Sequence, residues 1–223
     1  MTIRMSGTWR GALLLAAAAL FVVGVVSGVV LARGALSASD EPEVVSLPAR
    51  WASAIANDPT TLARSADAVF EGTVVAVEQQ RLWDPFEGEL GDASSSERRP
   101  EPLPISVFRV KVESAWVGEL AAGSEVLVEQ PGGSLAQSDG DTITVVLEFD
   151  ELLEVGETYL FWAQDSAADN GNLSTSPFMR LRVADDGSLE PLAAWSTLDG
   201  LRHYAERDSR GAGLEAQRLA DTR

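Results

Sequence analysis

The sequence contains no cysteine, one histidine (His203) and one lysine (Lys111) among its 223 residues. A chain without cysteine forms no disulfide and offers no thiolate to a zinc ion or an iron–sulfur cluster. A single histidine excludes zinc sites built from several imidazoles, and no G-x-S-x-G segment provides a serine nucleophile for His203. Basic residues are also scarce, because 17 Lys and Arg stand against 34 Asp and Glu. Phosphate contacts need clustered basic side chains, so nucleic acid is not an expected partner.

Charge is absent from residues 11–32, a run of 22 apolar and small residues. A helix of this length spans about 30 Å, the thickness of a bilayer core. Arg4 and Arg10 precede the run, so the positive-inside rule places the N-terminus in the cytoplasm and the rest of the chain outside. We therefore predict a cytoplasmic stub (1–10) and a single-pass transmembrane signal anchor (11–32) in the cell membrane. The alternative is secretion after cleavage of a signal peptide.

The net charge of −17 is divided unevenly along the chain. The first 33 residues hold three Arg and no acidic residue (+3), and the remaining 190 hold 14 basic and 34 acidic residues (−20). The exported part is therefore strongly acidic. We expect it to meet cations, a basic ligand or an envelope protein.

Strand patterns dominate the exported part. A flexible linker (33–50) is predicted to lead into a β-domain (51–190) that contains a long mobile loop (84–104). Alternation and β-branched residues predict its strands, and Gly72 marks a bulge or bend in the first of them. The strands are expected at 68–78, 105–118, 124–130, 141–149, 157–163 and 177–184.

Helices are expected only at the ends of this domain. Asp58 before Pro59 predicts a helix over 59–66, and Leu198, Leu201 and Tyr204 predict a short helix near 196–207. The rest of the C-terminal region (191–223) is interpreted as a frayed or loosely helical tail. The fold class is mainly β, either a small closed barrel or a sandwich.

Several segments also resemble a known group. They are Val69–Val74, Phe108–Val112 with Trp116-Val117-Gly118, Glu125–Val128 with Pro131-Gly132-Gly133, and Val155–Phe161. This pattern, over residues 62–187, resembles exported bacterial domains without an assigned activity and the OB-like barrel of the netrin module and the tissue inhibitors of metalloproteinases. The resemblance implies a five-stranded OB-like Greek-key barrel. It transfers no inhibitory residue, because those modules depend on cysteines that this chain lacks.

No residue is predicted to be catalytic, to bind a cofactor or to ligate a metal, and no cofactor is expected. His203 is interpreted as a solvated helix residue, Lys111 as a surface charge, and the acidic run Glu148–Glu154 as a solvated loop. Trp116 and Trp162 are expected in or beside the core, with Trp83 the most exposed tryptophan. Calcium needs only oxygen ligands, but its candidate segments are interpreted as ordinary Asx turns. These segments are Asp139-Gly140-Asp141, Asp165 with Asp169–Asn172, and Asp185-Asp186.

The sequence thus predicts a membrane-anchored extracytoplasmic binding or interaction module without catalysis, of unknown partner. The alternative is an envelope enzyme that uses carboxylates, either with or without calcium.

Overall fold

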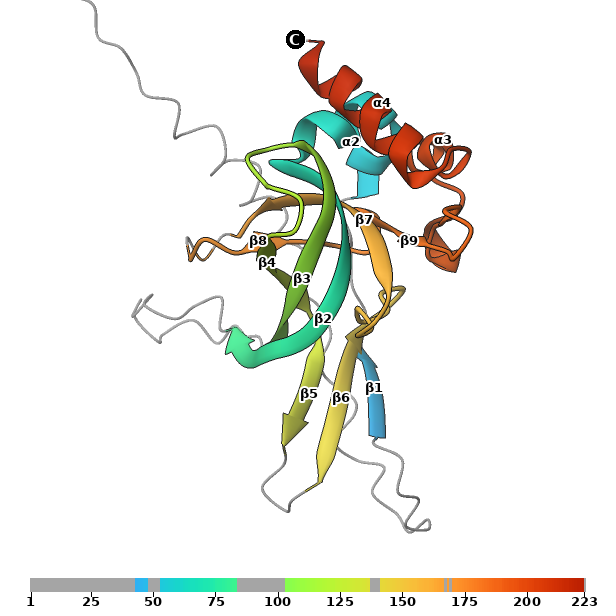
Figure 1. Cartoon of the computed structure of the whole chain (residues 1–223). Helices are drawn as coiled ribbons and strands as arrows, with labels where there is room; N and C mark the ends of the chain where they lie inside the picture. Colours follow the sequence, from blue (N-terminus) through green and yellow to red (C-terminus); the bar gives the residue numbers. More distant parts are fainter. Residues whose placement is uncertain are drawn as a thin grey trace, which may run out of the picture.

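The computed structural model describes residues 43–47, 53–83, 103–136, 141–166, 168 and 170–222 (Figure 1). Its mainly β character confirms the predicted fold class. The predicted stub, the transmembrane segment, most of the linker and the loop over 84–102 lie outside these residues. No helix in the described part of the chain is long and apolar enough to cross a bilayer.

The larger sheet has seven strands in the order β10-β9-β7-β2-β3-β4-β8. In addition, β8 pairs with β7, so the pairings run from β7 through β2, β3, β4 and β8 back to β7. The β4–β8 pair is parallel, and all the other pairs of this sheet are antiparallel. The strands are β2 (Ala68–Trp83), β3 (Leu103–Val117), β4 (Glu125–Pro131), β7 (Thr158–Asp165), β8 (Leu173–Ser174), β9 (Arg180–Val183) and β10 (Leu189–Glu190).

Strands β2 and β3 form the long hairpin at the centre of this sheet. Its register shifts between Glu71 and Gly72, which confirms the predicted bulge. A Cβ at Gly72 would lie 2.6 Å from Val110 Cγ1, so only glycine fits at this position without a shift of the neighbouring side chains. Two residues before Gly72 in β2, Phe70 stacks on Phe161 of β7 with ring centroids 5.0 Å apart. The strands thereby enclose one apolar core between them.

A second sheet has three strands in the order β1-β6-β5 and lies at the bottom of Figure 1. They are β1 (Glu43–Leu47), β5 (Gly133–Ala136) and β6 (Thr142–Leu147). The predicted flexible linker is wrong for Glu43–Leu47, because this segment pairs in parallel with β6. Trp83, predicted to be the most exposed tryptophan, is half-buried and packs on Leu103, Val145 and Leu147.

Two predicted strands are longer than the observed ones, one at its C-terminal end and the other at its N-terminal end. The strand expected over 141–149 ends at Leu147, because the chain turns at Phe149, whose φ is 63°. The strand expected over 177–184 begins only at Arg180, after a turn. The chain passes from β4 to β5 through Gly132, whose φ of 107° favours glycine.

Short helices cover the opposite end of the molecule, at the top of Figure 1. The prediction for 59–66 is confirmed by α2, whose Thr61 N–H donates to the Asp58 carboxylate at 2.6 Å. The prediction near 196–207 is confirmed by α3. Of the two alternatives for the tail, the helical one is confirmed by α4, but the helix is not loose, because it has a capped N-terminus and buries Ala212 and Ala216 completely. The elements are η1 (Ser53–Asn57), α2 (Pro59–Ser65), η2 (Ala193–Trp195), α3 (Asp199–Ala205) and α4 (Ser209–Asp221).

Helix α4 packs closely against β3. Gly213 faces the indole of Trp116 on β3, and a Cβ there would lie 2.1 Å from Trp116 Cδ2. Tyr204 on α3 is fully buried, and its hydroxyl donates to the Pro59 carbonyl at 2.9 Å. The helices therefore share a core with one face of the larger sheet.

Candidate functional site

A groove of about 770 Å³ lies where β4, the end of β7 and the start of β8 come together. Five of the residues that line it are apolar and are buried or half-buried, and we call these residues its floor. These are Ala68, Leu120, Val126, Leu127 and Leu173. A hollow with an apolar floor can hold an apolar group away from water.

Carboxylates surround this floor. Asp67, Glu119, Glu125 and Asp165 all line the groove and are all exposed. No Lys, Arg or His is among the lining residues. Two basic residues of β3 lie beside the groove: Arg109 Nη1 is 3.7 Å from Glu125 Oε2, and Lys111 is paired with Glu125 across the sheet. Carboxylates gathered around a low-dielectric surface give the groove a negative potential, which attracts cationic groups.

One wall of the groove is held by Glu129 of β4, a carboxylate with a side chain only 8% exposed. Its Oε1 accepts from Asn170 Nδ2 and Asn172 Nδ2, each at 2.7 Å. Its Oε2 accepts from Ser166 Oγ at 2.8 Å and from Arg81 Nη2 at 3.0 Å. Three of these donors belong to the β7–β8 connection, so Glu129 fixes the position of that wall.

Two opposing effects act on the pKa of Glu129. Burial works to raise its pKa, but the hydrogen bonds from Asn172, Asn170 and Ser166 and the charge of Arg81 outweigh burial and leave the pKa below its ordinary value. The carboxylate is therefore ionised at neutral pH.

The calcium candidates of the sequence analysis make other contacts in the structure. Asn170 and Asn172 turn their amide nitrogens toward Glu129. Asp186 accepts from the Ser188 N–H at 2.9 Å, which is the Asx turn expected there. Asp139, Gly140 and Asp169 lie outside the described residues. Within the described ranges, no group of three or more His, Cys, Asp or Glu residues is placed to hold a metal ion.

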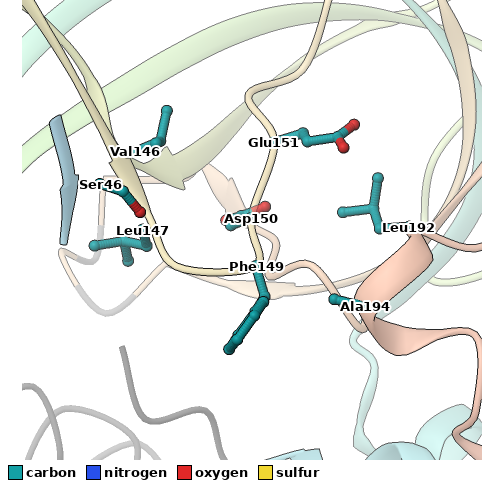
Figure 2. Close-up of a pocket in the computed structure, with 8 residues that line it drawn as sticks. All are labelled: Ser46, Val146, Leu147, Phe149, Asp150, Glu151, Leu192 and Ala194. Carbon is teal, nitrogen blue, oxygen red and sulfur yellow. The ribbon is translucent and has the colours of Figure 1, made fainter. Parts of the chain in front are cut away.

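A second, smaller cavity of about 310 Å³ lies beside the β6–β7 connection (Figure 2). Asp150 lines it, and Asp150 Oδ1 lies 2.6 Å from Arg180 Nη2 in an ion pair with both side chains 1% exposed. Leu153 is also buried, and its N–H donates to Gln130 Oε1. The prediction of a solvated loop over Glu148–Glu154 is therefore wrong at its centre.

The contacts around Asp150 give this cavity a structural role. Burial raises the pKa of Asp150 and outweighs the attraction of Arg180. Arg180 and Gln130 both donate to the Glu151 carbonyl, so the pair ties the connection to β9 and β4. In Figure 2 the ring of Phe149 points away from the Asp150 carboxylate. The Phe149 carbonyl accepts from Trp195 Nε1 at 2.7 Å, which fixes the turn from its other side.

The remaining candidates are not among the residues that line either cavity. Lys111 is exposed and its Nζ donates to Glu113 Oε1 at 3.1 Å, which confirms a surface charge. His203 is half-buried between α3 and α4, with Nε2 3.5 Å from Glu215 Oε1, so the prediction of a solvated residue is wrong. Trp162 is fully buried and Trp116 half-buried, as expected.

No model of a known protein family matches this chain. No curated protein sequence matches it either. Function must therefore be inferred from the geometry of the groove. Sequence reasoning singled out one part of this site, Asp165 with Asn170–Asn172, but as a candidate calcium segment. It missed Asp67, Glu119 and Glu125, because the carboxylates are spread along the chain with no regular spacing.

Proposed function

We propose that this protein is a membrane-anchored, extracytoplasmic binding module without catalysis, whose groove takes a basic and partly apolar polypeptide segment. The observation that carries the proposal is the groove itself. Four carboxylates surround an apolar floor, and no basic residue lines it. A lysine or arginine side chain matches such a surface, because its aliphatic stem can cover apolar groups while its charge meets the carboxylates.

We further infer that β2, β3, β4, β7 and β8 form an OB-like Greek-key barrel. Support comes from the pairings that return to β7 and from the parallel pair β4–β8. Strands β1, β5, β6, β9 and β10 are then additions to that barrel. The likeness to netrin modules stays a prediction, and no inhibitory function is borrowed from it.

The location is proposed from the sequence. Residues 11–32 are long and apolar enough to serve as a single-pass anchor, with Arg4 and Arg10 retained in the cytoplasm. The acidic domain would then lie outside, where anionic lipid headgroups repel it and basic partners approach it. Secretion after signal cleavage would leave the groove and its chemistry unchanged.

Binding to groove variants tests the proposal. The full chain in detergent micelles is titrated with a labelled peptide of alternating arginine and valine residues, and Kd is measured for Glu119→Gln/Asp165→Asn. Exposed ion pairs contribute about 0.2–1 kcal/mol each, so the double variant should bind about 2- to 30-fold more weakly. Raising the salt concentration should reduce the difference in Kd between the double variant and the wild type.

The matched control is Asp185→Asn/Glu190→Gln, which changes the net charge equally. Both residues are exposed and lie on the β9–β10 hairpin, on the other side of the molecule in Figure 1. The control should bind like the wild type. An equal loss in both variants would show that the peptide senses only overall charge, and turnover of any substrate abolished by a single groove substitution would favour the enzyme alternative.

A further inference from the structure

The first half of β4 has an unpaired edge. On one side β4 pairs with β3 along the whole stretch from Glu125 to Gln130. On the other side its only partner among the described strands is β8, which pairs with Val128 and Glu129 alone. Glu125, Val126 and Leu127 therefore have a strand beside them on one side only.

The direction of the backbone groups along this edge follows from the ladder. Val112 N–H donates to the Ser124 carbonyl at 2.8 Å, and Ser124 therefore faces β3. Because this direction alternates along an antiparallel strand, Val126 and Val128 also face β3, whereas Glu125 and Leu127 face away from it. The contact with β8 agrees with this alternation. Thr175 N–H donates to the Glu129 carbonyl at 3.0 Å, so Glu129, like Glu125 and Leu127, faces away from β3.

These outward-facing groups open into the groove. Glu125, Val126 and Leu127 are all lining residues, as are Asn170 and Asn172, which donate to Glu129. A backbone N–H or C=O beside an apolar floor gains a hydrogen bond when an extended chain is placed against it. The groove thus combines a charged rim, an apolar floor and a free strand edge.

We propose that the basic segment binds as an added β-strand, paired with β4 at Glu125 and Leu127. The inference rests on the proposed function and names the mode of docking. Both apolar residues (Leu120 and Leu173) and acidic residues (Glu119 and Asp165) line the groove beside this edge, and Asp165 pairs directly with Leu173. The preferred partner is accordingly an extended polypeptide that carries both basic and apolar residues.

Hydrogen exchange at single amides of the full chain, with and without the arginine–valine peptide, tests this mode. Pairing predicts that exchange of the Glu125 and Leu127 amides slows by about tenfold or more on binding. The Val126 and Val128 amides already donate toward β3 and should not change, which makes them an internal control in the same strand. Binding that leaves the Glu125 and Leu127 rates unchanged would overturn the added strand.

A second peptide separates this inference from the proposed function. It has the same sequence, but every backbone nitrogen is methylated, so it keeps its charges and side chains and loses its N–H donors. Strand addition predicts that Kd rises by tenfold or more. Equal binding of the two peptides would refute strand addition and leave the groove intact, whereas binding of neither would overturn the proposed function itself.

Discussion

Replacing Glu129 by glutamine should release the groove wall. The carboxylate accepts four hydrogen bonds, two at each oxygen, and an amide keeps only one oxygen as an acceptor. If the amide oxygen stays with Asn170 and Asn172, its NH₂ group faces the donors of Ser166 and Arg81. Hydrogen bonds to charged groups contribute about 1.5–3 kcal/mol each, and Ser166 can rotate to accept instead, so we expect a loss of about 2–4 kcal/mol.

The pH dependence of this loss identifies its cause. The folded-state pKa of Glu129 lies below its ordinary value of 4.5. The stabilisation is therefore fully present above the unfolded pKa and is lost as pH falls through the folded pKa. Wild type and Glu129→Gln should differ most near neutral pH and converge as the pH falls through the folded-state pKa of Glu129.

Denaturant unfolding at several pH values measures this difference. The control is Glu125→Gln on the same strand, where the side chain is 53% exposed and its contact with Arg109 is 3.7 Å long. That variant should lose no more than about 1 kcal/mol. A Glu129→Gln deficit that is equally large at pH 7 and in acid would refute the reasoning, because it could not come from the carboxylate charge.

Three further substitutions test the rest of the fold by denaturant unfolding. Gly213→Ala should destabilise by about 1–3 kcal/mol despite alanine's better helix propensity, because its Cβ would strike Trp116, whereas a gain in stability would contradict that contact. Asp208→Ala should cost about 1 kcal/mol through the lost cap of α4 and nothing if that segment is frayed. Arg180→Met should cost about 3–5 kcal/mol because it leaves Asp150 buried without its partner, and a neutral result would show that water reaches this carboxylate.

The sequence was most informative where local chemistry decides the structure. The Asp58-Pro59 start of α2 needs only residues within one turn, and the alternation of β3 needs only its own strand. Gly72 likewise marked its bulge from within the strand. These predictions are confirmed because tertiary contacts reinforce the local preference.

Long-range partners account for the elements that were missed. Glu43–Leu47 has the composition of a spacer and becomes a strand only because β6 lies beside it. Helix α4 has many polar residues and two internal glycines, and it is stabilised by Trp116 and α2 from distant parts of the chain. The buried pair Asp150–Arg180 joins a connection that looks solvated in the sequence to the first residue of β9. None of these contacts leaves a periodic signal in the sequence.

The groove was beyond sequence reasoning for the same reason. Its floor and rim come from the starts of β2 and β4, the β3–β4 turn and the β7–β8 connection. The carboxylates that meet there are indistinguishable in the sequence from the other acidic residues. Only the pairing of the strands brings them together.

Mapping the bound peptide onto the chain tests the central claim most directly. The methyl groups of leucine and valine are followed by NMR while the arginine–valine peptide is added to the full chain in micelles. We predict that the methyl signals of Leu120, Val126 and Leu173 shift, while those of Leu135 and Leu192, which lie outside the groove, stay in place. Shifts scattered evenly over the molecule, or gathered at Leu192 beside the smaller cavity, would contradict the groove as the binding site.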